Sequence, residues 1–287
     1  MLKRFRVVFS LLLILGFSVT LSAQEGKDAY FLHAPGSYWV YEDQDGNELT
    51  RRAVSEKTIE GETYHAFNYE PALEEWADYD YHIYPNLYQV GEERVTFLIG
   101  EEAQKAVKAR FTKEMETFIK IGKQMSPDIN IFYQIKAEVQ DPFYALPASV
   151  AFNEKWEATQ IKAKITMATF PPQDPEEIIV EFTIVETGKV LGTEKVETPA
   201  GTFEDCLKIE YRTETGVTTV PPQDENPPGE TVTTLWVTPN VGIVKFHQKT
   251  EDILLKVIPI LEPKDSTTIK ILKLKRYEVK SADSDGR

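Results

Sequence analysis

The chain has 287 residues, of which 41% are hydrophobic and 27% are charged, so most of it should fold around a core. Its formal net charge of −14 disfavours nucleic acid and anionic lipid headgroups as partners, because a negative surface repels both. The single cysteine, Cys206, excludes an intramolecular disulfide. We expect Cys206 to be a small buried residue rather than a reactive thiol.

Residues 1–23 have the three parts of a secretory signal peptide. Three basic residues lie between positions 3 and 6, an apolar run follows over 7–17, and Ala23 offers a small residue at the cleavage edge. An uncleaved anchor is the alternative, but the run is shorter than the ~20 residues of a membrane span. We therefore expect an exported protein, periplasmic or extracellular, with no membrane span after cleavage. Its 29 basic and 46 acidic residues would then give a net charge of −17.

The mature chain opens with strand signals. Pro-Gly-Ser-Tyr-Trp-Val-Tyr at 35–41 begins a strand, and Asp45-Gly46 predicts a hairpin turn. The alternating polar residues of 43–48 fail the spacing of a calcium loop, so the turn is favoured. Further strands are predicted over the ranges 49–58, 62–69, 87–90 and 94–99.

Residues 70–88 combine aromatic and acidic side chains in an unusual density. Their aromatic members could form an exposed face that binds a ligand or partner; the candidates are Trp76, Tyr79, Tyr81, His82 and Tyr84. Alternatively, Asp78, Asp80 and His82 would lie on one side of a strand, where they could coordinate a cation or form part of a hydrolase site. Because a fourth ligand is missing, we expect neither a metal nor another cofactor.

A helix is predicted over 101–123. Glu101 and Glu102 stand at its positive end, and one apolar stripe repeats at about 3.6 residues; it consists of Val107, Phe111, Met115 and Phe118. The simplest function of that stripe is to cover one face of a sheet. A helix lying on a membrane surface is the alternative, but its polar face is not strongly basic.

The remainder of the chain predicts strands to the end. Alternating apolar residues indicate strands within 129–139, 161–167, 178–184, 231–237, 243–249 and 268–279. A change of alternation near Leu272 predicts a bulge or burial on both faces, and the proline-rich stretches 170–175 and 221–229 predict loops. The polar tail 281–287 is expected to be disordered.

Residues 196–211 are the clearest single piece of scaffold. Thr198-Pro-Ala-Gly201 has the chemistry of a type I turn. In the strand that follows, alternation places Leu207, Ile209 and Tyr211 on one face together with Phe203.

Several stretches resemble those of a group of uncharacterised exported bacterial β-rich proteins with a domain of unknown function. The shared patterns are V-E-T-P-A-G-T-F-x-D-C-L-K from Val196 and W-x-x-P-x-V-G-I-V-K from Trp236. The opening at 35–41 and the closing strand through Leu272 and Tyr277 belong to the same resemblance. It implies a long antiparallel sheet, curved like that of the periplasmic lipoprotein carriers. No activity is established for the group, so no catalytic residues carry over from it. The helix at 101–123 and the stretch 70–88 lie outside it.

These observations predict a mainly β (α+β) fold. A long, curved antiparallel sheet built from hairpins should have one amphipathic helix on one face, within a single exported domain over 24–280. Two related halves meeting near 125–150 are a further arrangement that stays open. The expected function is non-catalytic binding of a partner protein or apolar ligand, the partner being an envelope protein. A hydrolase built on 70–88 and a structural subunit of an envelope assembly are the alternatives; the ligand and the oligomeric state stay open.

Overall fold

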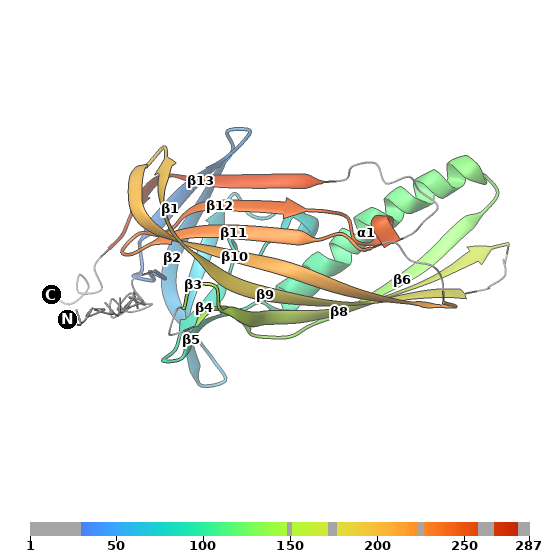
Figure 1. Cartoon of the computed structure of the whole chain (residues 1–287), viewed down its shortest axis with the longest axis horizontal. Coiled ribbons are helices and arrows are strands. Elements are labelled where there is room, and N and C mark those ends of the chain that lie inside the picture. Colours follow the sequence, from blue (N-terminus) through green and yellow to red (C-terminus); the bar gives the residue numbers. More distant parts are fainter. Residues whose placement is uncertain (1–29, 148–150, 172–176, 223–226, 258–266, 281–287) are drawn as a thin grey trace, which may run out of the picture.

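The computed structural model describes residues 30–147, 151–171, 177–222, 227–257 and 267–280 (Figure 1). The expected signal peptide and C-terminal tail lie outside the described residues. Within them, thirteen strands form one open antiparallel sheet, in the order β6-β8-β9-β10-β11-β12-β13-β1-β2-β3-β4-β5-β7. One long helix accompanies it, so the predicted mainly β fold is confirmed.

The elements follow one another along the chain as hairpins. The strands before the long helix are β1 (Tyr38–Asp43), β2 (Glu48–Ile59), β3 (Glu62–Glu70), β4 (Leu87–Val90) and β5 (Arg94–Leu98), with the short 3₁₀ helix η2 (Trp76–Asp78) between β3 and β4. The long helix is α1 (Gly100–Met125). After it come β6 (Asn130–Val139), β7 (Phe143–Pro147), β8 (Lys155–Phe170), β9 (Glu177–Thr198), β10 (Gly201–Val220), β11 (Thr231–Thr238), β12 (Gly242–Thr250), the short helix α2 (Leu254–Val257) and β13 (Thr268–Glu278).

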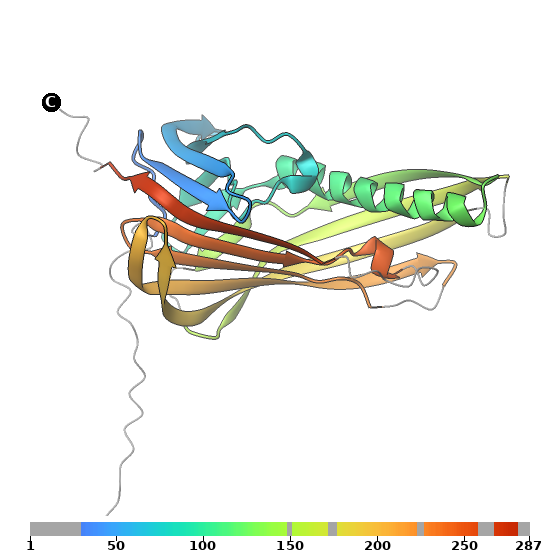
Figure 2. The same ribbon diagram turned by 90° about the horizontal axis from the view of Figure 1, so that it is seen from above.

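The sheet is rolled rather than flat. β6 and β7 stand at opposite ends of the strand order, yet only residues 140–142 join them, so the two ends of the sheet must meet in space. Trp156 on β8 closes this seam, since its indole N–H donates to the carbonyl of Tyr144 on β7 at 2.9 Å. Away from the seam β6, β8, β9 and β10 extend beyond the rolled end as a paired, open part of the sheet, and α1 runs along its inner side (Figures 1 and 2).

Two apolar cores follow from this shape. The first fills the rolled end and contains Trp39, Tyr41, Phe97, Phe143 and Tyr211, all fully buried. The second lies between α1 and the inner faces of β8 and β9. There Phe111 of α1 stacks on Phe182 of β9 with ring centroids 5.0 Å apart. The predicted helix and its task of covering the sheet are thus confirmed, although the helix continues two residues past 123.

Several local predictions are confirmed and others are corrected. Asp45-Gly46 forms the turn between β1 and β2, and Cys206 is fully buried. The register of β1 and β13 shifts between Leu274 and Arg276, close to the irregularity predicted near Leu272. Residues 79–86 form turns and loops, so the strand that was to align Asp78, Asp80 and His82 does not exist. The 70–88 stretch starts with a loop because proline at position 71 cannot donate to a ladder.

Candidate functional site

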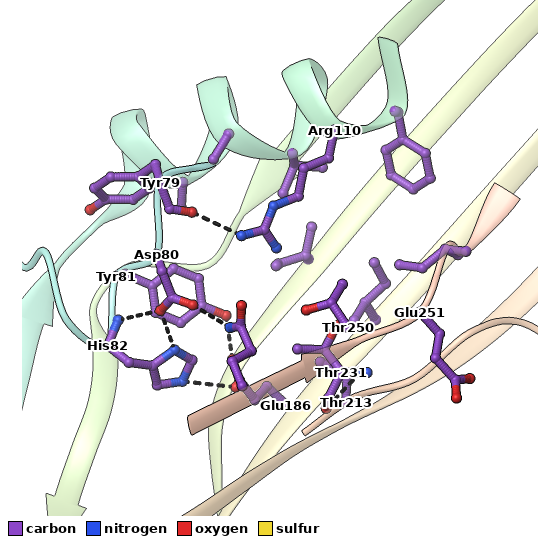
Figure 3. Close-up of a pocket in the computed structure, with 18 of the residues that line it drawn as sticks. Tyr79, Asp80, Tyr81, His82, Arg110, Glu186, Thr213, Thr231, Thr250 and Glu251 are labelled. Carbon is purple, nitrogen blue, oxygen red and sulfur yellow. Dashed lines mark hydrogen bonds and ion pairs between the residues drawn. The ribbon is translucent and has the colours of Figure 1, made fainter. Parts of the chain in front are cut away.

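A cavity lies where the two cores meet, between α1, the loop 79–82 and the inner face of the sheet (Figure 3). The space open to water-sized molecules has a volume of about 80 Å³. Its apolar walls come from both layers. Ala103, Ala106, Val107 and Phe111 line it from α1, and Ile161, Ile184 and Ile253 line it from the opposite side. Where the apolar face of a helix packs on the apolar face of a sheet, small side chains such as alanine leave space that larger side chains would fill.

One end of the cavity is polar and is built from three distant segments. His82 lies between two carboxylates: its Nδ1 is 2.7 Å from Oδ1 of Asp80, and its Nε2 is 3.0 Å from Oε1 of Glu186 on β9. Tyr81 donates its hydroxyl proton to the second oxygen of Glu186. Gln248 of β12 donates an amide proton to the second oxygen of Asp80. We call these five residues the buried polar network.

The charge state of the network follows from its geometry. His82, Asp80 and Glu186 are each at most 3% exposed. Burial alone would lower the pKa of His82, but the two carboxylates outweigh it and raise that pKa to about 9. Burial likewise opposes ionisation of Asp80, yet His82 holds the pKa of this carboxyl well below its usual value. At neutral pH the network is therefore an imidazolium flanked by carboxylates.

This arrangement limits what the network can do chemically. Both ring nitrogens of His82 donate to carboxylates, so neither is free to accept a proton from a substrate or a nucleophile. No serine, threonine or cysteine of the described residues forms a hydrogen bond with His82. The geometry that the hydrolase alternative requires, His82 meeting Asp80 and further polar groups in a cavity, is present. A ring nitrogen that is free to accept a proton, which a general base requires, is not present in His82.

The loop that carries Asp80 and His82 is tied to α1. Arg110 donates to the backbone carbonyls of Ala77 at 3.1 Å and Tyr79 at 2.9 Å (Figure 3). Within the loop, Oδ1 of Asp80 accepts the backbone N–H of His82 at 2.9 Å. A tight turn, rather than the alternation of a strand, thus brings Asp80 and His82 together.

The other aromatic candidates have separate places. Tyr79 and Tyr81 line the cavity, with Tyr79 buried and Tyr81 half-buried. Trp76 is 39% exposed on the outer side, and Lys105 lies over its ring at 5.1 Å. Tyr84 packs against Tyr69 at 5.1 Å between ring centroids, away from the cavity lining. The five candidates therefore do not form one face; only Tyr79, Tyr81 and His82 share a site.

Asp78 is exposed and does not join Asp80 and His82. The described residues contain no group of three His, Cys, Asp or Glu side chains arranged to hold a metal ion.

A second acid lies at the other end of the cavity. Glu114 is half-buried on α1 and accepts three backbone N–H groups from the start of α2. Burial and the neighbouring Asp252 raise its pKa to about 7. A carboxyl group that titrates near neutrality is uncommon and marks a place where the environment works against the charge.

The sequence contained signals for the residues that the predictions missed. Glu186 follows Ile184 at the next inward position of β9, and Gln248 follows Phe246 in the same way on β12. Glu114 lies beside Phe111 and Met115 on the helix face that meets the sheet. A polar residue at an inward position is a stronger indication of a built site than aromatic character, on which the candidates were chosen.

Comparisons with known proteins place the chain in a family without assigning an activity. The fold is similar to that of two solved structures at 13% identity each. One is an inferred lipoprotein of Parabacteroides distasonis, with 87% of this chain and 99% of that chain covered and a TM-score of 0.38. The other is an inferred exported protein of Bacteroides fragilis with a YmcC-like fold, with 87% and 98% covered and a TM-score of 0.37. No curated protein matches.

The described residues contain no helix that is long and apolar enough to cross a membrane. A model of the DUF3108-like family matches residues 101–251. The match begins at α1, so the expectation that this helix lies outside the family pattern is wrong, whereas 70–88 does lie outside the matched residues. Since the match spans more than half of the 287 residues, the chain belongs to the DUF3108-like family.

Proposed function

We propose that this protein is a non-catalytic exported β domain that binds an apolar ligand between α1 and the rolled sheet. The observation that carries the proposal is the cavity itself. Its walls include apolar side chains of α1, β8 and β9, and the five side chains of the buried polar network at one end are hydrogen-bonded to one another. A ligand that needs no polar partner of its own fits such a lining. The leader that the sequence predicts over 1–23 would direct export.

The buried polar network has a structural task in this account. It joins the loop 79–82 to β9 and β12, and so fixes one wall of the cavity. An imidazolium held between two carboxylates supports no general-base chemistry at neutral pH. A hydrolase on 70–88 is accordingly the weaker alternative.

The size of the cavity bears on the class of ligand. About 80 Å³ holds two or three water molecules at ~30 Å³ each, whereas sites for small organic molecules are commonly ~300 Å³ or more. The side chains of Leu254 and Val257 occupy the adjoining space between α1 and the sheet, and both are buried. An apolar ligand that displaces them would fit the enlarged groove, whereas a charged ligand would not.

Binding of N-phenyl-1-naphthylamine, an uncharged apolar fluorophore, tests the proposal. Ala106→Leu adds three carbon atoms inside the cavity lining, so we expect the fluorescence enhancement of the wild type to fall at least fivefold. Ala109→Leu is the matched control, because Ala109 lies on the same helix outside the lining, and it should bind as the wild type does. Equal binding by all three proteins would place the fluorophore elsewhere and contradict the proposed site.

A different surface supports the partner-protein form of the function. The outer faces of β6, β8, β9 and β10 carry an apolar patch at the open end of the sheet, made of Phe132, Ala168, Phe170, Ile179 and Val220. Phe132 is 62% exposed, Phe170 63% and Val220 51%. We call it the distal patch. Exposed aromatic residues gathered on one face are typical of a surface that meets another macromolecule.

A further inference from the structure

We infer that residues 252–257 form an internal plug in the ligand groove and that Glu114 acts as a pH-sensitive latch on this plug. The plug would close the groove while Glu114 is protonated and would leave it more readily once Glu114 ionises. The inference rests on the proposed function in one respect only, namely that the opened groove would bind an apolar ligand. The contact between Glu114 and the plug stands on its own geometry.

One side chain of α1 accepts hydrogen bonds from the backbone at the start of the plug. Oε2 of Glu114 accepts the backbone N–H groups of Leu254 at 2.7 Å and Leu255 at 3.1 Å. Its Oε1 accepts the N–H of Ile253 at 3.3 Å. These are the groups that a helix start leaves without an internal partner, so a residue of α1 caps a helix that is distant in sequence. Loss of this contact would leave α2, which has only four residues, without its cap.

The plug occupies apolar space that a ligand could use. Leu254 and Val257 belong to the core beneath α1, together with Phe111 and Met115. Ile253 borders the cavity directly. The plug therefore fills apolar space that adjoins the cavity. Its departure would join that space to the cavity and form one groove along α1.

The charges around Glu114 set the direction of the pH effect. Asp252 of the plug opposes its ionisation, while Glu251 is neutralised by Lys249 and Lys256. From α1, Arg110 lies one turn away with its guanidinium directed to the loop carbonyls. Across the cavity, Asp80, His82 and Glu186 form the closed network described above. Burial is the largest cause and Asp252 the second, and both favour the protonated form. The three backbone N–H groups favour the ionised carboxylate, but they lower the pKa by less than burial and Asp252 raise it.

The direction of the pH effect follows from proton linkage between the closed and the open form. In the closed form the pKa of Glu114 is about 7, compared with its ordinary value of 4.5, which hydration in an open form would restore. The closed form thus binds the proton more tightly, and a rise in pH favours opening. Between pH 6 and 8 the two values predict an increase in the open population of about tenfold, since each pH unit between the two pKa values changes the equilibrium up to tenfold.

Hydrogen exchange tests the latch without any ligand. The measured quantity is the protection of a peptide covering 251–257, corrected at each pH for the exchange rate of an unstructured peptide. We expect the wild type to lose protection about tenfold from pH 6 to pH 8. Glu114→Gln keeps an acceptor oxygen without a titrating proton, so its protection should not change with pH. Asp252→Asn should reduce the wild-type effect, and it provides a second variant if Glu114→Gln folds poorly.

Glu116→Gln is the matched control, because Glu116 is exposed on the same helix; it should retain the full effect. Protection that is flat with pH in the wild type, or that falls equally in Glu114→Gln, overturns the latch. The fluorophore separates the two proposals. Exchange that follows the prediction without any N-phenyl-1-naphthylamine binding refutes the ligand function and supports the latch. Binding with flat exchange refutes the latch and supports the function.

Discussion

His82 shows how a single buried residue can make stability depend on pH. Its native pKa of about 9 lies above the ordinary value of 6.5, because Glu186 and Asp80 offset the effect of burial. The stabilisation is therefore complete below pH 6.5 and is lost as the pH rises through 9. The raised pKa corresponds to a contribution of about 3 kcal/mol to the free energy of unfolding, at 1.36 kcal/mol per pKa unit.

We expect His82→Gln to lower the free energy of unfolding by about 3–5 kcal/mol at pH 6.5, because it leaves the two carboxylates without their shared cation. The difference from the wild type should shrink by about 3 kcal/mol at pH 10, when wild-type His82 is neutral. Urea unfolding at the two pH values measures both quantities. His247→Gln is the control, since His247 lies outside the network; a difference for His82→Gln that is constant with pH would show that His82 is not charged.

Cys206 offers a second measurement at the residue scale. It is fully buried, and burial raises the pKa of its thiol to about 11. Since the thiolate is the reactive form, we expect no reaction with an aromatic disulfide reagent at pH 8 in the native protein and one equivalent of reaction in urea. Prompt reaction of the native protein would mean that the strand around Cys206 opens and that the thiol is accessible.

The residues of the site were predictable in part. His82, Tyr79 and Tyr81 were among the candidates, and the cavity includes all three. Trp76 and Tyr84 were chosen for their aromatic character, which is a property that solvent-exposed and core residues share. Glu186 and Gln248 escaped notice because their partners lie more than 100 residues away in sequence, and alternation within one strand does not reveal what faces it.

At the scale of elements, the rolled seam depends on a glycine. Gly188 of β9 is the register partner of Trp156, and a Cβ atom at this position would lie 2.3 Å from the indole ring. The ring can pack across β9 only because the side chain is missing. In this position it donates to Tyr144 of β7 and contacts Tyr211 edge-on.

Gly188→Ala should therefore lower the free energy of unfolding by about 1–3 kcal/mol, the usual cost of overpacking a fitted site. Gly216→Ala is the matched control in the neighbouring strand β10, where the nearest atom to a new Cβ is 3.8 Å away. We expect the control to be neutral or slightly stabilising. Chemical denaturation followed by tryptophan fluorescence measures both; equal stability of the two variants would show that the seam tolerates a displaced indole ring.

The elements themselves were largely predictable, because each depends on local pattern. Strict alternation identified β8, β9 and β10, and the charged ends with an apolar stripe identified α1. β7 was not singled out, since its short run Phe-Tyr-Ala-Leu-Pro has no alternation. It is a strand because the seam buries Phe143, Ala145 and Leu146, which is a consequence of tertiary packing.

The whole molecule could not be predicted from local patterns. The pairings of β1 with β13 and of β5 with β7 join strands that are separated by much of the chain or by the helix. These pairings decide that the sheet rolls up and that α1 covers only its open part (Figure 2). The cavity exists because the rolled core and the helix-covered core meet without filling the space between them.

The distal patch gives a prediction at this scale. The double variant Phe132→Ser with Phe170→Ser removes two exposed rings, so the stability of the protein should change by less than ~1 kcal/mol. If the patch meets an envelope protein, co-purification of that protein should fall severalfold. Thr166→Ser with Lys164→Gln, on the same outer face but without aromatic rings, is the control. Unchanged co-purification in the double variant would remove the patch as an interface.

The central claim is that an apolar molecule occupies the space between α1 and the sheet. Native mass spectrometry of the protein purified from its own envelope fraction tests it most directly. We predict a bound molecule that organic solvent extracts, present on the wild type and on Ala109→Leu and strongly reduced on Ala106→Leu. The bare protein mass in all three samples, or an adduct that is equally abundant on Ala106→Leu, would contradict this account.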